Sequence, residues 1–137
     1  MSLVLDSSVT LTWYFEDERT PATAAVLRQV AEFGASVPTL WRLEVANGFQ
    51  MALRRGRIDA IYRDASIADL TLLPISIDQD TDTYAWTTTL RLAERFLLTL
   101  YDVAYLELAQ RRSLPLATLD RELRSAATAL GLVLLGE

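Results

Sequence analysis

The chain has 137 residues, 51% of them hydrophobic, which is the size and composition of one globular domain that can bury its own core. It has no cysteine, which excludes disulfides and thiolate metal sites, and no histidine, which removes the most common general base. All 13 basic residues are arginines and the net charge is −5, so any polyanion would have to be held locally, by a few arginines or by bound cations.

In the first half of the chain, short apolar runs alternate with helical patterns. Residues 3–5 predict a buried strand that ends at Asp6, and residues 35–37 predict a second strand. Thr20 followed by Pro21 is typical of a helix start, a capping hydroxyl with proline at the first helical position. Helices are expected at residues 7–15, 21–33, 39–55 and 59–72.

The same alternation continues in the second half. Residues 73–77 predict a third strand, whose Pro74 indicates an edge strand or a first position. Residues 114–119 and 132–135 predict two more strands. Helices are expected at residues 80–95, 101–112 and 121–130. Because strands alternating with helices imply crossover connections, we expect a single α/β domain over residues 1–137, with a parallel sheet of four to five strands flanked by helices.

Two aspartates stand where the functional crevice of such a sheet is expected. Asp6 and Asp120 each directly follow an apolar strand, and sites in open α/β sheets lie beyond the carboxyl ends of the strands. Each could instead merely cap the next helix. For Asp120 this alternative is stronger, because Arg124 stands four residues later. A matched pair on two strands of one sheet nevertheless indicates a shared site.

Glu44 and Asp102 lack a basic residue three or four positions away on their predicted helices. Three other glutamates do have such a partner: Glu107 with Arg111, Glu32 with Arg28, and Glu94 with Arg91. An unpaired carboxylate on an apolar flank is costly to bury unless something positive meets it. Asp64 and Asp69 are also unpaired, so this criterion enriches for site residues without defining them. For Asp102, a role in offsetting the helix dipole is the alternative explanation.

Several carboxylates gathered in one crevice raise one another's pKa, and a divalent cation removes that conflict. Oxygen-only ligands and the absence of histidine and cysteine point to Mg²⁺ or Mn²⁺ and away from zinc. With neither residue present, hydrolysis would rely on a metal-bound water as the nucleophile, and the ion would also stabilise charge on a phosphoryl group. The hypothesis is therefore a metal-dependent nuclease.

Taken together, these segments resemble the PIN-domain ribonucleases, and among them the VapC-type toxins of bacterial toxin–antitoxin pairs. The resemblance covers nearly the whole chain, and although each motif alone is weak, the ordered set is specific. The motifs are Val4-Leu5-Asp6-Ser7-Ser8, Leu43-Glu44-Val45-Ala46-Asn47, Arg54-Arg55-Gly56-Arg57-Ile58, Leu100-Tyr101-Asp102-Val103-Ala104-Tyr105-Leu106-Glu107-Leu108-Ala109 and Leu116-Ala117-Thr118-Leu119-Asp120.

The resemblance implies a PIN-like fold and an endoribonuclease that needs Mg²⁺ or Mn²⁺. The acidic positions of the family, expected to be catalytic and to bind the metal, fall on Asp6, Glu44, Asp102 and Asp120. Residues expected to support these ligands are Ser8, Thr118 and Asn47. The resemblance also implies a homodimer, an RNA substrate and a cognate antitoxin that lies across the active-site groove. Glu122, the only match for a further acid of the family, is left out of the core site.

The N-terminus lacks the basic region of a signal peptide, and no apolar run is long enough to cross a bilayer, so we expect a cytoplasmic protein without a membrane partner. Arg54, Arg55 and Arg57 form the densest basic patch. They could contact RNA phosphates or an acidic antitoxin segment, but offsetting the dipole at a helix C-terminus is the simpler explanation. The three tryptophans are expected in the core.

Two functions from other classes compete with the nuclease hypothesis. A phospho-acceptor signalling domain needs an adjacent acidic pair after the first strand and a late lysine, but Asp6 is followed by two serines and lysine is absent. A catalytically silent PIN-like module for dimerisation or partner binding stays open, although the retention of all four acids argues against it.

Overall fold

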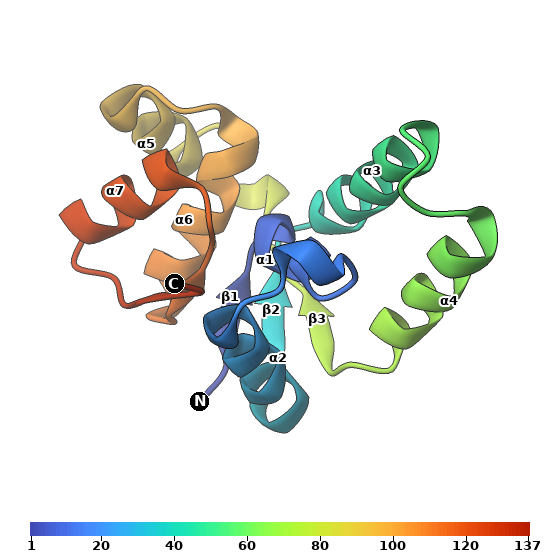
Figure 1. The fold of residues 1–137 in the computed structure, drawn as a ribbon. Coiled ribbons are helices and arrows are strands. Elements are labelled where there is room, and N and C mark those ends of the chain that lie inside the picture. Colours follow the sequence, from blue (N-terminus) through green and yellow to red (C-terminus); the bar gives the residue numbers. More distant parts are fainter.

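The computed structural model describes residues 1–137 and has a five-stranded sheet at its centre (Figure 1). The strands are β1 (Leu3–Leu5), β2 (Ala35–Val37), β3 (Ile75–Ile77), β4 (Leu116–Ala117) and β5 (Leu134–Leu135). Their order across the sheet is β3-β2-β1-β4-β5, and every neighbouring pair is parallel. The predicted single-domain α/β fold with a parallel sheet is confirmed. β1 lies in the middle of the sheet, between β2 from the first half of the chain and β4 from the second half.

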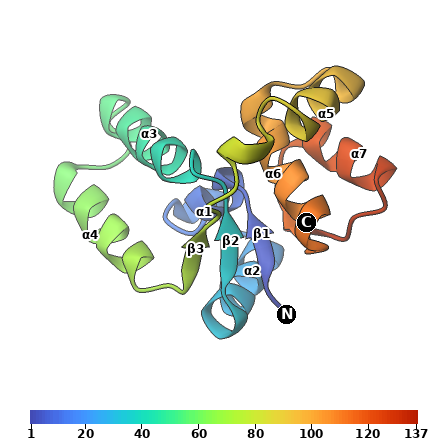
Figure 2. The same ribbon diagram turned by 180° about the vertical axis from the view of Figure 1, so that it is seen from behind.

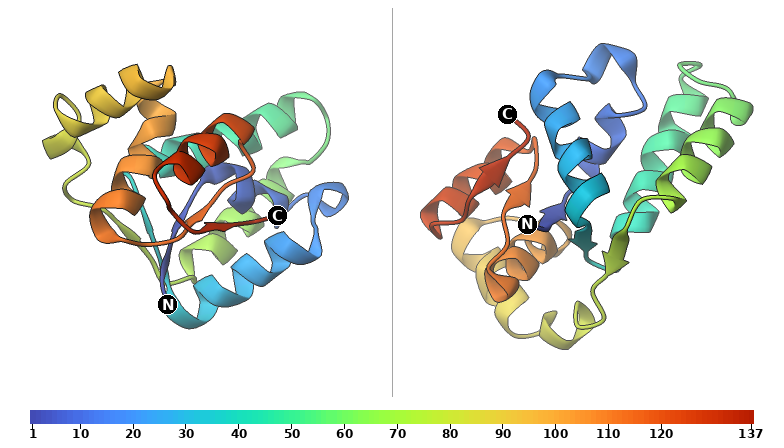
Figure 3. Two further views of the ribbon diagram at one scale, coloured as in Figure 1. Left: turned by 90° about the vertical axis from the view of Figure 1, so that its left-hand side faces the viewer. Right: turned by 90° about the horizontal axis from the view of Figure 1, so that it is seen from below.

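Seven helices surround the sheet, and two 3-10 turns, Glu16–Glu18 and Asp82–Tyr84, lie in the connections. The helices are α1 (Ser7–Thr12), α2 (Pro21–Phe33), α3 (Trp41–Arg54), α4 (Ala60–Thr71), α5 (Thr88–Phe96), α6 (Leu100–Arg112) and α7 (Arg121–Ala129). α2 covers one face of the sheet and α6 the opposite face (Figure 3). α3 and α4 form a hairpin beyond the β3 edge (Figure 2). None of the helices is long and apolar enough to cross a bilayer.

The core is continuous through the sheet and its covering helices. All three residues of β1 and both residues of β4 are fully buried. Every residue of α6 from Val103 to Ala109 is buried as well, so this helix is hidden on nearly all sides. The largest fully buried side chains are Tyr105 and Phe49. Close packing on nearly all sides holds α6 in place, and so fixes the position of its first turn.

Most predicted elements are confirmed, with shorter ends. Pro74 directly precedes β3, which is an edge strand as its proline predicted, because an edge position tolerates a residue without an amide hydrogen. Thr20 and Thr23 form a reciprocal cap at the start of α2. Trp13 and Trp41 are buried as expected, but Trp86 is 90% exposed, which corrects the expectation that it belongs to the core.

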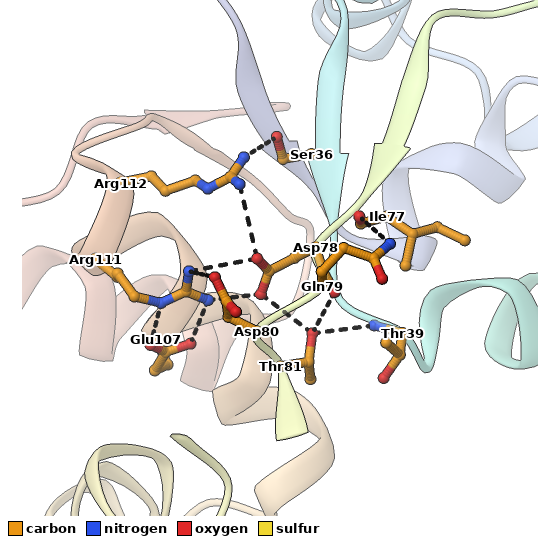
Figure 4. Close-up of polar contacts among 10 residues, drawn as sticks. All are labelled: Ser36, Thr39, Ile77, Asp78, Gln79, Asp80, Thr81, Glu107, Arg111 and Arg112. Atoms are coloured by element: carbon orange, nitrogen blue, oxygen red, sulfur yellow. Dashed lines mark hydrogen bonds and ion pairs between the residues drawn. The ribbon is translucent and has the colours of Figure 1, made fainter. Parts of the chain in front are cut away.

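The expected helix over residues 80–95 was wrong in its first half. Asp82–Tyr84 forms only a 3-10 turn, and Thr87 has φ −123° and ψ −98°, so α5 begins one residue later. The reason is an ion network around Asp78 that holds this connection against α6 (Figure 4). Local periodicity carries no information about such a contact.

The centre of that network is Arg111, on the last turn of α6. Its guanidinium donates to the carboxylates of Asp78 at 2.6 Å and Glu107 at 2.7 Å (Figure 4). It also stacks on Tyr84, 4.7 Å from the centroid of the ring. Both acids are almost fully buried. Burial works against ionisation of Asp78, but the hydrogen bonds and charge of Arg111 hold its pKa below the ordinary value of 3.8. The network joins the segment after β3 to α6.

Candidate metal centre

The four predicted carboxylates come from four different segments around the carboxyl ends of the central strands. Asp6 follows β1 and Asp120 follows β4, and these two strands are direct neighbours. Glu44 lies in the first turn of α3 and Asp102 in the first turn of α6. Their charges act on one another. The negative charges of Asp102 and Asp120 raise the pKa of Asp6, and those of Asp6 and Asp102 raise the pKa of Glu44.

Asp6 is the most buried of the four, with 7% of its surface exposed. Its Oδ2 accepts hydrogen bonds from the hydroxyls of Ser8 and Thr118, both at 2.7 Å. Each hydroxyl in turn accepts a backbone N–H, from Leu119 at 3.0 Å and Asp120 at 3.1 Å, respectively. The hydroxyl protons are therefore directed at Asp6. Only the distant Ser7 hydroxyl, at 3.5 Å, approaches the other carboxylate oxygen, which is left available for a ligand.

The capping explanation fails for Asp6. It occupies the N-cap position of α1, but its side chain accepts no hydrogen bond from the helix backbone. Burial raises its pKa above the ordinary value of 3.8, the hydroxyls of Ser8 and Thr118 counteract this, and the negative charges of Asp102 and Asp120 raise it further. No cation takes part in this balance. The two hydroxyls favour the charged form of Asp6, and no basic residue of the chain neutralises that charge.

Glu44 is half-buried and also lacks a basic partner. Its Oε1 accepts a hydrogen bond from the phenol of Tyr105, and the hydroxyl of Ser7 lies 3.5 Å from the same oxygen. Burial raises the pKa of Glu44, the bond from Tyr105 lowers it, and the charges of Asp6 and Asp102 raise it again. Glu44 could be suspected from the sequence because no basic residue stands near it on the helix. Nothing in the sequence marked Tyr105, which stands in an apolar stretch of α6 and resembles a core residue.

Asp102 and Asp120 complete the arrangement at helix starts. Thr99 caps α6 by accepting the N–H of Asp102 at 3.2 Å, so the Asp102 carboxylate is not needed as a cap. Burial and the charge of Asp120 raise its pKa. Asp120 does cap α7, through Oδ1 and the N–H of Leu123 at 2.9 Å. Its second oxygen accepts no hydrogen bond, so a capping role leaves it free for a ligand.

Three of the four predicted arginine pairs do not form. Arg124 donates to the carbonyls of Thr118 and Leu135 and pairs with Glu137 at 3.3 Å, so it leaves Asp120 without a cation. Arg28 and Arg91 form no ion pair, whereas Arg111 pairs with Glu107 as expected. The ion pair that this spacing suggested for Asp120 therefore does not form, whereas the helix cap that was its alternative explanation does.

The remaining predicted residues lie outside this hydrogen-bonded cluster. Asn47 is exposed on α3 and forms no side-chain hydrogen bond, so its supporting role stays a prediction. Arg57 pairs with Asp17 at 2.9 Å and Glu18 at 3.1 Å, and stacks on a phenylalanine ring. It is thus engaged in tying the end of α3 to the turn before α2. Arg54 and Arg55 are exposed and form no ion pair.

The donor set fits a hard divalent cation. All candidate ligands are carboxylate oxygens, which Mg²⁺ and Mn²⁺ prefer, and three of the four carboxyls have pKa values raised by burial and by one another. As the side chains stand, no three acids lie close enough together to hold an ion. Binding would therefore draw the outer carboxylates, Glu44, Asp102 and Asp120, toward the fixed oxygen of Asp6.

Comparison with known proteins bears on this arrangement. A family model described as the PIN domain matches residues 3–129. The crystal structure of PAE2754 from Pyrobaculum aerophilum has a similar fold, with a TM-score of 0.72 and 20% identity over 98% of this chain and 89% of that one. VapBC2 from Rickettsia felis, solved bound to a DNA fragment from their promoter, has a TM-score of 0.63 and 14% identity, over 98% and 97% of the two chains. No curated protein matches.

At these identities the two solved structures show the fold alone. The family model goes further, because it spans the first four strands, all seven helices and each of the four carboxylates. The chain therefore belongs to the PIN-domain family.

Proposed function

We propose that this protein is an endoribonuclease that depends on Mg²⁺ or Mn²⁺ and acts as the toxin of a toxin–antitoxin pair. PIN domains are generally nucleases, and so hydrolases. The observation that carries the proposal is the Asp6 carboxylate, which is buried beside other acids and held by hydroxyls, with no cationic partner. By contrast, the buried carboxylate of Asp78 forms an ion pair with Arg111.

The chain's own residues would prepare the site for the ion. Ser8 and Thr118 orient Asp6 and favour its charged form, while Asp102 and Asp120 extend from helix starts near it. Glu44 would close the site from α3. A bound ion supplies a water nucleophile at neutral pH and stabilises charge on the phosphoryl group. Because the net charge of the protein is −5, its surface as a whole does not attract RNA, and a bound ion would provide attraction for an RNA phosphate.

The toxin role is proposed because this chain is similar in fold to a chain of the solved VapBC2 structure. By analogy, this chain would bind a cognate antitoxin, form a homodimer and work in the cytoplasm. The exposed arginines 54 and 55 are free to meet an acidic antitoxin segment or RNA. A catalytically silent PIN-like module for dimerisation or partner binding is the second candidate, and direct assay separates the two.

The test is incubation of the purified chain, free of antitoxin, with RNA and with DNA of the same sequence, with Mn²⁺ or with a chelator. We expect cleavage of RNA with Mn²⁺ only. Asp102→Asn should lower the rate by about 100-fold or more, because loss of a ligand costs at least as much as loss of a residue that supports one. Asp69→Asn, an exposed acid of α4 outside the site, is the matched control and should cut normally.

Each other outcome has a definite meaning. Cleavage that persists in the chelator would contradict the metal dependence, and preference for DNA would contradict the substrate assignment. Asp102→Asn cutting at the wild-type rate would remove it from the site. No cleavage in any lane would favour the partner-binding module.

A further inference from the structure

We infer that Tyr105 is a positioning residue for the metal centre, whose phenol holds one oxygen of Glu44 so that the other faces the ion. The inference rests on the proposed function and adds to it a residue outside the expected acidic and hydroxyl set. Tyr105 lies on α6 one helical turn after Asp102, and Glu44 lies on α3, 61 residues away in the chain. The contact joins α3 and α6, the helices that carry Glu44 and Asp102.

Tyr105 is buried in a way that makes this contact specific. None of its surface is exposed, and it is the largest fully buried side chain. A phenol in that position needs a polar partner, because a buried hydroxyl without one is unfavourable. The hydrogen bond that it donates goes to Glu44 Oε1. A bond from a neutral donor to a carboxylate is strong and directional, so the ring that packs in the core also fixes the position of Glu44.

The same design is seen twice in the site. Oδ2 of Asp6 receives two hydroxyls, from Ser8 and Thr118, while Oε1 of Glu44 receives Tyr105 and, more weakly, Ser7. In each acid one oxygen is occupied by protein hydroxyls and the other accepts no strong hydrogen bond. Ser7 lies 3.5 Å from both Asp6 Oδ1 and Glu44 Oε1, and so links the two acids. Such hydroxyls keep a carboxylate charged and oriented without adding a competing cation.

The experiment is direct measurement of Mn²⁺ binding by calorimetry on the full chain. Tyr105→Phe keeps the buried ring and removes only the hydroxyl, so the core packing is preserved. We expect Mn²⁺ affinity to fall by about 10-fold or more, the usual loss when a residue that supports a metal ligand is removed. Tyr62→Phe is the matched control, because it removes a phenol that donates to the carbonyl of Tyr14 away from the site. Its affinity should be unchanged.

A double variant separates positioning from a general structural effect. If Tyr105 acts through Glu44, then Tyr105→Phe combined with Glu44→Gln should bind Mn²⁺ no worse than Glu44→Gln alone. Losses that add in the double variant, or an unchanged affinity in Tyr105→Phe, would overturn the inference.

A readout that needs no metal distinguishes failure of this inference from failure of the proposed function. Glu44→Gln should change the ultraviolet difference spectrum of a buried tyrosine, and the change should be absent when Tyr105 is already phenylalanine. A wild type that binds no Mn²⁺ would overturn the nuclease proposal and this inference with it. Normal Mn²⁺ binding without the tyrosine signal would overturn the positioning role alone.

Discussion

At the level of single residues, the acids of this chain whose pKa values are shifted fall into two groups with opposite electrostatics. Asp78 is held by Arg111, which keeps its pKa low. Asp6, Glu44 and Asp102 have no such partner, and burial together with mutual repulsion raises the pKa of each. The second group makes the native state less stable at neutral pH than it need be, which is typical of side chains kept for function.

This difference predicts a pH dependence of stability without divalent ions. An acid whose native pKa is raised binds its proton more tightly when folded, so the free energy of unfolding falls as pH rises through the interval above the ordinary values of 3.8 for Asp6 and 4.5 for Glu44. Asp78 acts oppositely, and its stabilisation is lost only as pH falls below 3.8. Melting temperatures measured from about pH 4 to about pH 7 in chelator should therefore decline.

Two controls define that prediction. Asp6→Asn removes one of the responsible groups, so its melting temperature should decline less over the same range. Mg²⁺ should raise the wild-type melting temperature most at the upper end of the range, because only ionised carboxylates bind it and a ligand of the native state stabilises that state. Equal slopes for wild type and Asp6→Asn in chelator would show that Asp6 has an ordinary pKa.

At the level of elements, the position of Glu44 depends on how closely α3 approaches α1. Gly48, one turn after Glu44, faces Leu11 of α1, and a Cβ atom built there would lie 2.9 Å from the Cδ2 and 3.2 Å from the Cγ of Leu11. A Cβ atom closer than 3.0 Å to another carbon is essentially never found, so either the flexible side chain of Leu11 or the whole helix would have to move. A glycine at this place lets α3 bring its acid up to the residues that follow β1.

Gly48→Ala should therefore harm activity more than stability. The alanine gains up to about 1 kcal/mol of helix propensity, while overpacking costs about 1–3 kcal/mol, so the net loss of stability should be small. Displacement of Glu44 from Asp6 should lower the cleavage rate by about 10-fold or more, since small misplacements are costly to catalysis. Adding Leu11→Ala removes the clash and should restore part of the rate. Full activity of the single variant would show that α3 tolerates the shift.

Much of the architecture could be predicted because it follows from local patterns. The apolar runs at residues 3–5 and 35–37 are strands, and proline at position 74 precedes an edge strand. Placing acids directly after strands needed only the geometry of parallel sheets, which brought Asp6 and Asp120 to neighbouring positions.

The features that were missed depend on contacts between distant segments. The helix expected from residue 80 is displaced by Asp78, whose partner Arg111 lies 33 residues further along the chain. The spacing of Arg124 to Asp120 suggested an ion pair, but the carbonyls at the ends of β4 and β5 take that arginine instead. Tyr105 has the pattern of a core residue, and only the folded chain shows that its hydroxyl meets Glu44.

For the molecule as a whole, the Asp78–Arg111–Glu107 network holds the β3 edge of the sheet to α6. Arg111→Met keeps the length of the side chain but leaves buried Glu107 without a cation and buried Asp78 with only the more exposed Arg112, at 3.8 Å. We expect a loss of about 3–5 kcal/mol in the free energy of unfolding, as for other broken buried ion pairs. Chemical denaturation measures it.

Arg63→Met is the matched control, because Arg63 pairs only with the exposed Asp64, and such a pair contributes about 1 kcal/mol or less. The Arg111→Met deficit should shrink at low pH, where the buried Asp78 takes up a proton. A deficit no larger than that of Arg63→Met would mean that water reaches the network and replaces the arginine.

The pair of hydroxyls on Asp6 also has a consequence for the order in which activity arises during translation. Ser8 is synthesised two residues after Asp6, but Thr118 is synthesised 112 residues after it, directly following strand β4, which must insert next to β1. A nascent chain on the ribosome therefore carries its first acid long before that acid is oriented, and Asp102 and Asp120 are also late products. Chains that stop short of β4 are expected to be inert, so a cell would be exposed to the proposed nuclease only after β4 and Asp120 have been synthesised.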